Sequence, residues 1–180
     1  MSDRPADNLH VLLDAVAFAA RAHRRQQRKD GKTPYVSHVF RVCLILRHVF
    51  GIDDDRSMAA ALLHDAIEDT TTDFDDLVEH FGAEVAGWVA ALTKDSRLPW
   101  DEREEAYCKG LAEAPWQVKA CKLADVYDNL MDSVALKPEQ RAKTASKARR
   151  YLNALDRPDL PAHVKRAWKI VNELVTRQTV

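Results

Sequence analysis

Apolar residues recur along the chain with the period of an α-helix. The clearest stripe occupies positions i, i+3, i+4, i+7 and i+11, and consists of Leu9, Leu12, Leu13, Val16 and Ala20. This spacing covers one face of a helix, which we expect to run from about Asp7 to Gln26. No alternating pattern of useful length indicates a strand. The sequence therefore predicts an all-α fold, a helical bundle of about eight to nine helices.

Caps and helix breakers divide the remaining sequence into further helices. Gly31 and Pro34 predict a loop after the first helix, and Ser37 is a candidate N-cap for the next. One of Asp53, Asp54 and Asp55 is expected to cap the third helix, and Thr72 with Asp75 resembles a capping box. The expected helices are Ser37–Gly51, a third through Met58–Thr70, Thr72–Gly82, Ala83–Thr93, one after Pro99 that ends near Pro115, Trp116–Met131, Pro138–Leu155 and Pro161–Thr176. No linker or repeat separates them, so we expect one domain over residues 1–180.

Composition indicates the cellular compartment and the classes of partner that are not expected. A net charge of -1 over 180 residues gives no reason to expect nucleic acid or a membrane as a partner. The chain has 3 cysteines, an odd number without a CxxC pair, which is typical of a reducing compartment. No apolar stretch reaches the length of a membrane span, and the N-terminal residues lack an apolar signal core. We therefore expect a cytoplasmic protein, and the sequence leaves its oligomeric state open.

Candidate chemistry gathers on the helix through Met58–Thr70. The side opposite its apolar stripe carries four polar residues within an arc of about 140° on a regular helix, namely His64, Asp65, Glu68 and Asp69. Their three carboxylates repel one another, and no cation of that helix offsets them, whereas a bound divalent ion would. Acidic residues on a helix are usually its solvated face, but such a face more often includes Lys or Arg. We favour a metal site.

Two further segments supply matching ligands. His38 begins the second helix, and Asp125 lies on the amphipathic helix through KACKLADVYDNL, with Asn129 one turn later. Alone, His38 would be interpreted as a core histidine and Asp125 as a partner of Lys122. Together with His64 and Asp65 they provide nitrogen and oxygen ligands that suit Mn²⁺, Fe²⁺ or Zn²⁺. Such an ion would activate water and neutralise phosphoryl charge, with Glu68 and Asp69 as acid, base or orienting groups.

The order of these motifs resembles a known family. PYVSH, ALLHDAIEDT and KLADVYDNL follow one another as in the hydrolase domain of RelA/SpoT-type alarmone enzymes. The likeness begins at AFAARAH, includes QRKDGKTPYVSH and FGAEVAGWVAALTKD, and extends to about Asp132, roughly three-quarters of the chain. An HD pair alone occurs in many phosphohydrolases, but this combination is far more specific. The chain is most similar to the stand-alone small alarmone hydrolases, the Mesh-type branch of HD-domain proteins.

The resemblance implies a reaction and a set of site residues. The reaction is metal-dependent removal of the 3′-pyrophosphate from guanosine tetra- or pentaphosphate, (p)ppGpp, giving GDP or GTP. The resemblance implies Mn²⁺ as cofactor, one ion per chain, held by His38, His64, Asp65 and Asp125. It also implies catalytic roles for Glu68 and Asp69, and nucleotide contacts for Arg28, Lys29 and Asn129. Without the HD motif, Arg28 and Lys29 would be interpreted as part of a solvated basic loop.

Two positions depart from the family pattern and keep other functions open. Met131 stands where arginine is frequent, and Asp128 where histidine or tyrosine is common. Both concern the substrate side, so the first alternative is another HD phosphohydrolase, such as a nucleotidase or an NADPH phosphatase. The second is a non-enzymatic nucleotide or RNA binder that uses RRQQRK and the basic helix RAKTASKARR. The ligand set and the Glu68–Asp69 pair argue against it, since a pure binder does not require them.

Overall fold

Helices form almost all of the secondary structure. A computed structural model describes residues 5–178, and within them the helices are α1 (Pro5–Ala22), α2 (Val36–His48), α3 (Asp55–Leu63), α4 (Ala66–Asp69), α5 (Phe74–Leu92), α6 (Trp100–Glu113), α7 (Trp116–Ser133), α8 (Pro138–Leu155) and α9 (Ala162–Gln178). The sole strand-like pairing over this range is an isolated bridge between Gln27 and Pro34. The predicted all-α fold is confirmed, and nine helices agree with the expected number.

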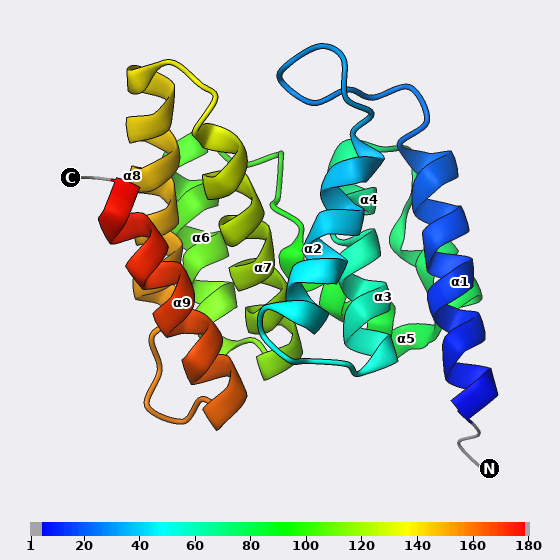
Figure 1. Ribbon diagram of the computed structural model, residues 1–180. Coiled ribbons are helices and arrows are strands. Elements are labelled where there is room, and N and C mark those ends of the chain that lie inside the picture. Colours follow the sequence, from blue (N-terminus) through cyan, green and yellow to red (C-terminus); the bar gives the residue numbers. More distant parts are fainter. Residues whose placement is uncertain (1–4, 179–180) are drawn as a thin grey trace.

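Two helices form the centre of the molecule. Every residue of α3 from Ser57 to Leu63 is buried, and small alanines at 59–61 let neighbouring helices approach closely. α1 and α2 pack against α3, while α7 packs against α2, α3, α5, α8 and α9. Figure 1 shows α1 at one side of the bundle and α8 with α9 at the other. Within residues 5–178, no helix is long and apolar enough to cross a bilayer.

The loop between α1 and α2 begins earlier than expected. α1 ends at Ala22 and not near Gln26, because the chain folds back on itself there. The Tyr35 amide donates to the Gln26 carbonyl (2.9 Å) and the Arg28 amide to the Thr33 carbonyl (2.8 Å), which closes residues 26–35 into a tight loop. This loop and the α7–α8 connection lie at the same end of the bundle (Figure 1).

Capping residues differ in part from those predicted. Asp54 caps α3 by accepting from the Ser57 amide, as expected for the Asp53–Asp55 run. Tyr35, without a side-chain cap, precedes α2, so the prediction for Ser37 is wrong. The capping box of α5 is formed by Asp73 and Asp76, one residue beyond the predicted pair. The stop expected at Gly82 is a kink inside α5, with φ 81° and ψ 161°, a conformation that essentially only glycine adopts.

The helix that carries the HD pair is not continuous. α3 ends at Leu63 and α4 begins at Ala66, so the predicted helix through Met58–Thr70 is wrong at its most important point. His64 keeps helical angles, but Asp65 adopts φ −101° and ψ 2°, between the helical and extended regions. Because of the break, His64 and Asp65 do not lie on one regular helix.

Candidate metal centre and adjoining pocket

Three of the four predicted metal ligands form one compact group, and the fourth lies beside it. Ligand atoms of His38, His64 and Asp65 all lie within 4.8 Å of one another. His38 Nε2 is 3.5 Å from Asp65 Oδ2, and His64 Nε2 is 3.0 Å from the same oxygen. Asp125 Oδ1 completes the group from α7, 3.3 Å from His38 Nε2 and 3.8 Å from His64 Nε2. Two imidazoles and two carboxylates thus face each other from α2, the α3–α4 break and α7.

The break between α3 and α4 allows neighbouring residues to share this point. On a regular helix, side chains at i and i+1 point about 100° apart and do not meet. Because Asp65 leaves the helical conformation, its carboxylate turns back toward His64 Nε2. The arc predicted for a continuous helix is therefore wrong, and the break is what brings the Asp65 carboxylate to His64.

Both imidazoles are arranged as metal ligands. His38 Nδ1 is hydrogen-bonded to Asp128 Oδ2 (2.7 Å), and His64 Nδ1 donates to the carbonyl of Ala61 (2.8 Å). With Nδ1 carrying the hydrogen, each Nε2 presents a lone pair to the carboxylates. The buried His64 Nε2 finds no hydrogen-bond partner among residues 5–178. A lone pair 3.0 Å from a carboxylate oxygen is unfavourable unless a cation lies between them, so the site fits a divalent metal.

The carboxylates make this point favourable for positive charge. Burial would raise the pKa of Asp65, but positive charge beside it, that of a protonated His64 first, outweighs burial and holds that pKa well below its usual range. With both Nε2 atoms unprotonated, a metal ion would supply this positive charge. Burial would also raise the pKa of Asp125, and the charge of Lys122 outweighs it in the same way. The Lys122 amine donates to Asp125 Oδ2 at 2.8 Å while Oδ1 faces the imidazoles. Asp125 thus serves as both the partner of Lys122 and a candidate ligand.

The two predicted catalytic residues lie in different surroundings. The Tyr35 hydroxyl donates to Asp65 Oδ2 (2.6 Å) and lies 3.3 Å from Asp69 Oδ2, which links Asp69 to the metal centre. Partial burial and the charge of Asp65 raise the pKa of Asp69. Glu68 is exposed, and its Oε2 accepts from the backbone amide of Lys94 (3.1 Å). Within residues 5–178, Glu68 makes no hydrogen bond or ion pair with the four ligands, so its role stays a prediction. Tyr35, which sequence reasoning placed only in the loop, is an additional member of the centre.

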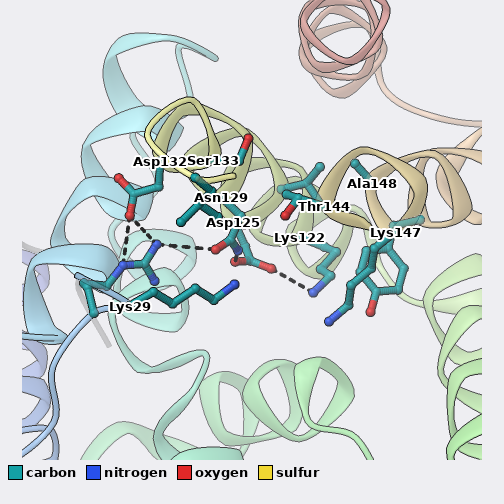
Figure 2. A pocket seen from close by; sticks show the side chains of 13 residues that line it. Lys29, Lys122, Asp125, Asn129, Asp132, Ser133, Thr144, Lys147 and Ala148 are labelled. Atoms are coloured by element: carbon teal, nitrogen blue, oxygen red, sulfur yellow. Dashed lines mark hydrogen bonds and ion pairs between the residues drawn. The ribbon is translucent and has the colours of Figure 1, made fainter. Parts of the chain in front are cut away.

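A pocket opens beside the metal centre and contains all three predicted substrate residues. Arg28, Lys29 and Asn129 line it together with Asp125. Arg28 is held by two hydrogen bonds to Asp132 (3.0 and 2.6 Å) and one to Asn129 (3.4 Å). Figure 2 shows Lys29 reaching into the pocket from the loop, opposite Lys122. The α1–α2 loop therefore brings its cations to α7.

The far wall of the pocket is basic, which sequence reasoning missed. Figure 2 shows Lys122 and Lys147 on this wall. Tyr151 also lines the pocket. The amine of Lys122 lies 4.5 Å from the centre of the Tyr151 ring, and that of Lys94 lies 5.7 Å from it. Partial burial and the charges of Lys94 and Lys122 lower the pKa of Lys147. An anionic ligand in the pocket would offset the repulsion among these lysines. Lys147 belongs to the basic helix RAKTASKARR, and only the fold shows that it faces the site.

The two departures from the family pattern have different positions. Met131 is 45% exposed and lies on the α2–α7 surface with Leu44 and Tyr127, outside the substrate pocket. Asp128 is fully buried and hydrogen-bonded to His38. The methionine therefore leaves the pocket lining unchanged, whereas Asp128 acts on the metal centre.

Known proteins are similar to this chain in sequence and in fold. Residues 15–153 match the family model described as HD domain. Guanosine-3′,5′-bis(diphosphate) 3′-pyrophosphohydrolase MESH1 from Xenopus tropicalis is 42% identical over 130 residues, which cover 72% of this chain and 73% of the relative. The Homo sapiens MESH1 is 44% identical over 129 residues, covering 71% and 72%. A solved structure, described as a metazoan ortholog of SpoT that hydrolyzes ppGpp, superposes with a TM-score of 0.79 at 32% identity, covering 91% of this chain and 94% of the other. The chain therefore belongs to the HD-domain family, in the branch formed by the MESH1 pyrophosphohydrolases.

Proposed function

We propose that the protein hydrolyses (p)ppGpp to GDP or GTP and pyrophosphate. The relatives that carry this activity in their names match 71–72% of the chain at 42–44% identity. The proposal rests on two adjoining features: a largely buried His/His/Asp/Asp centre, and a basic pocket that shares Asp125 with it. A highly anionic nucleotide fits such a pocket, and its scissile phosphate would lie at the centre.

The proposed cofactor is one Mn²⁺ held by His38, His64, Asp65 and Asp125. Mixed nitrogen and carboxylate ligands suit this ion, and no thiolate faces the point where they meet in residues 5–178. When bound, a divalent ion supplies activation of water and neutralisation of phosphoryl charge. Tyr35 orients Asp65 through its hydroxyl, while Asp69, whose pKa is raised, is placed to hold or release a proton.

The substrate would lie across the pocket. The guanidinium of Arg28 is held by Asp132 and Asn129 and lies over the Tyr35 ring. Its other face would stack on a purine. Lys29 on one side and Lys122 with Lys147 on the other supply positive charge for the phosphates. We also propose the cytoplasm as the compartment, because all three cysteines are free.

Ion-exchange chromatography of the products tests the assignment. We expect Mn²⁺-loaded protein to convert ppGpp to GDP and pyrophosphate, with NADPH and a deoxynucleoside monophosphate as parallel substrates. Asp65→Ala, which lacks a ligand, is the matched inactive control. If ppGpp survives while NADPH or the deoxynucleotide is consumed, the substrate assignment is wrong and the HD chemistry remains.

A further inference from the structure

A fully buried carboxylate stands behind one of the metal ligands. Asp128 has no exposed surface, and its Oδ2 lies 2.7 Å from His38 Nδ1. Its other oxygen, Oδ1, lies 2.6 Å from Arg41 Nε, and Arg28 Nη2 is 3.8 Å from Oδ2. Arg41 extends to Asp132 as well, where its Nη1 donates to Oδ1 at 2.6 Å.

The arrangement is reciprocal between two helices. α2 supplies the ligand His38 and, one turn later, Arg41, whereas α7 supplies the ligand Asp125 and, one turn later, Asp128. Each helix therefore contributes one ligand and one residue that contacts the opposite helix. A hydrogen bond to the second nitrogen fixes the tautomer and the ring orientation of a ligating imidazole, and Asp128 supplies that bond for His38.

A buried carboxylate requires a compensating cation at this position. Leaving such a charge unpaired in the interior is strongly unfavourable. Arg41 supplies this cation from the protein surface, where its side chain is 43% exposed. It does not line the pocket that contains Arg28 and Lys29.

We propose that Asp128 is the positioning residue for His38, and that Arg41 is the cation that balances its buried charge. The inference rests on the proposed metal set. It assigns roles to two residues that contact neither the metal point nor the pocket cavity directly, and it explains why a carboxylate is accommodated where the related family has other residues.

Manganese affinity of metal-free protein tests the role of Asp128. Titration with Mn²⁺, followed by the electron paramagnetic resonance of the free ion, should show a Kd raised by about 10–100-fold in Asp128→Ala. Asp128→Asn keeps an oxygen acceptor for Nδ1 and should recover most of the affinity. Asp132→Ala is the matched control, since Asp132 contacts both arginines but not His38. We expect its Kd to stay within about two-fold of wild type, in line with small effects away from ligand contacts.

The outcomes separate this inference from the proposed function. A wild-type protein that binds no Mn²⁺ would contradict the metal proposal itself. Tight binding by wild type and by Asp128→Ala alike would leave the metal proposal standing and overturn the role of Asp128. The same holds if Asp132→Ala weakens binding as much as Asp128→Ala does.

Thermal unfolding of the metal-free protein tests the role of Arg41. Arg41→Met should lower Tm by about 3–6 °C, because it leaves the carboxylate poorly compensated. In an Asp128→Asn background the same substitution should lower Tm by much less, since the charge is already absent. Equal decreases in the two backgrounds would overturn the pairing of Arg41 with Asp128.

Discussion

At the scale of single residues, the metal ligands are side chains that contact the protein with one polar atom and face the metal point with another. Asp125 gives one oxygen to Lys122 and the other to the metal point, and His64 gives one nitrogen to a carbonyl and the other to the same point. Each ligand is thereby fixed before any ion binds. Because the ligands are already in position, we expect the loss of one ligand to weaken metal binding more than the loss of a nearby charge.

Asp65→Ala and Asp125→Ala should each lose bound metal together with activity. The physical reason is that either substitution removes an oxygen from a four-ligand set. Plasma mass spectrometry after dialysis measures the metal. Asp69→Asn is the control and should keep its metal, because Asp69 touches the centre only through Tyr35. Full metal content in both alanine variants would exclude this ligand set.

Glu68→Gln should retain metal while kcat falls by about two to four powers of ten, the usual contribution of acid–base assistance. Steady-state kinetics on ppGpp measure the loss, and Glu79→Gln, an exposed glutamate of α5, controls for the loss of a surface charge. A wild-type kcat would remove Glu68 from the mechanism and leave Asp69, which the Tyr35 hydroxyl links to the centre.

At the scale of elements, one buried glutamate joins three parts of the chain. Glu104 on α6 accepts from the Tyr151 hydroxyl of α8 (2.9 Å), and Lys94 Nζ, just after α5, lies 3.2 Å away. Burial would raise the pKa of Glu104, but the charge of Lys94 and the bond from Tyr151 outweigh it and lower that pKa. Glu104 therefore ties the wall of the pocket to the rest of the bundle.

The lowered pKa of Glu104 predicts how stability depends on pH. A carboxyl whose folded pKa lies below its unfolded value of about 4.3 stabilises the fold above that value, and loses this contribution as pH falls through the folded pKa. Glu104→Gln should therefore lower Tm clearly at pH 7 and much less at pH 3, as measured by calorimetry. Glu105→Gln, the exposed neighbour, should change Tm little at either pH. A Tm difference for Glu104→Gln that is independent of pH would contradict the assignment.

At the scale of the whole molecule, the pocket is assembled from segments far apart in sequence. The α1–α2 loop, α7 and α8 contribute Arg28, Asn129 and Lys147 respectively. The loop and the α7–α8 connection meet at one end of the bundle, so nucleotide binding would join both halves of the chain (Figure 1).

Lys147→Met should raise KM for ppGpp by about ten-fold at low ionic strength, with a smaller change in kcat. The reason is that the lysine meets phosphate charge, and added salt screens that attraction over about 10 Å at 0.1 M, so the difference from wild type should shrink as salt increases. Lys143→Met on the same helix is the control, because Lys143 is exposed and does not line the pocket. Equal effects of the two substitutions would show that only net charge matters.

The sequence by itself determined the helices and the chemistry of the ligands. Apolar spacing requires only neighbours along the chain, so it placed the helical segments with modest errors at their ends, except for the helix through Met58–Thr70, which breaks in its middle. Residue types then restricted the metal, because imidazole and carboxylate select certain ions wherever they meet. The motifs added the identities of His38 and Asp125, which spacing alone could not connect to His64 and Asp65.

Only the tertiary structure decided how these groups act together. The break at His64–Asp65 is visible only in the fold, because no local signal in ALLHDAIEDT marks it. The partnership of Asp128 with Arg41 and the position of Lys147 join residues distant in sequence, which local periodicity does not encode. The physical reason is that periodicity fixes which face of a helix is apolar, whereas packing fixes which other helix that face meets and which polar atoms are brought within bonding distance.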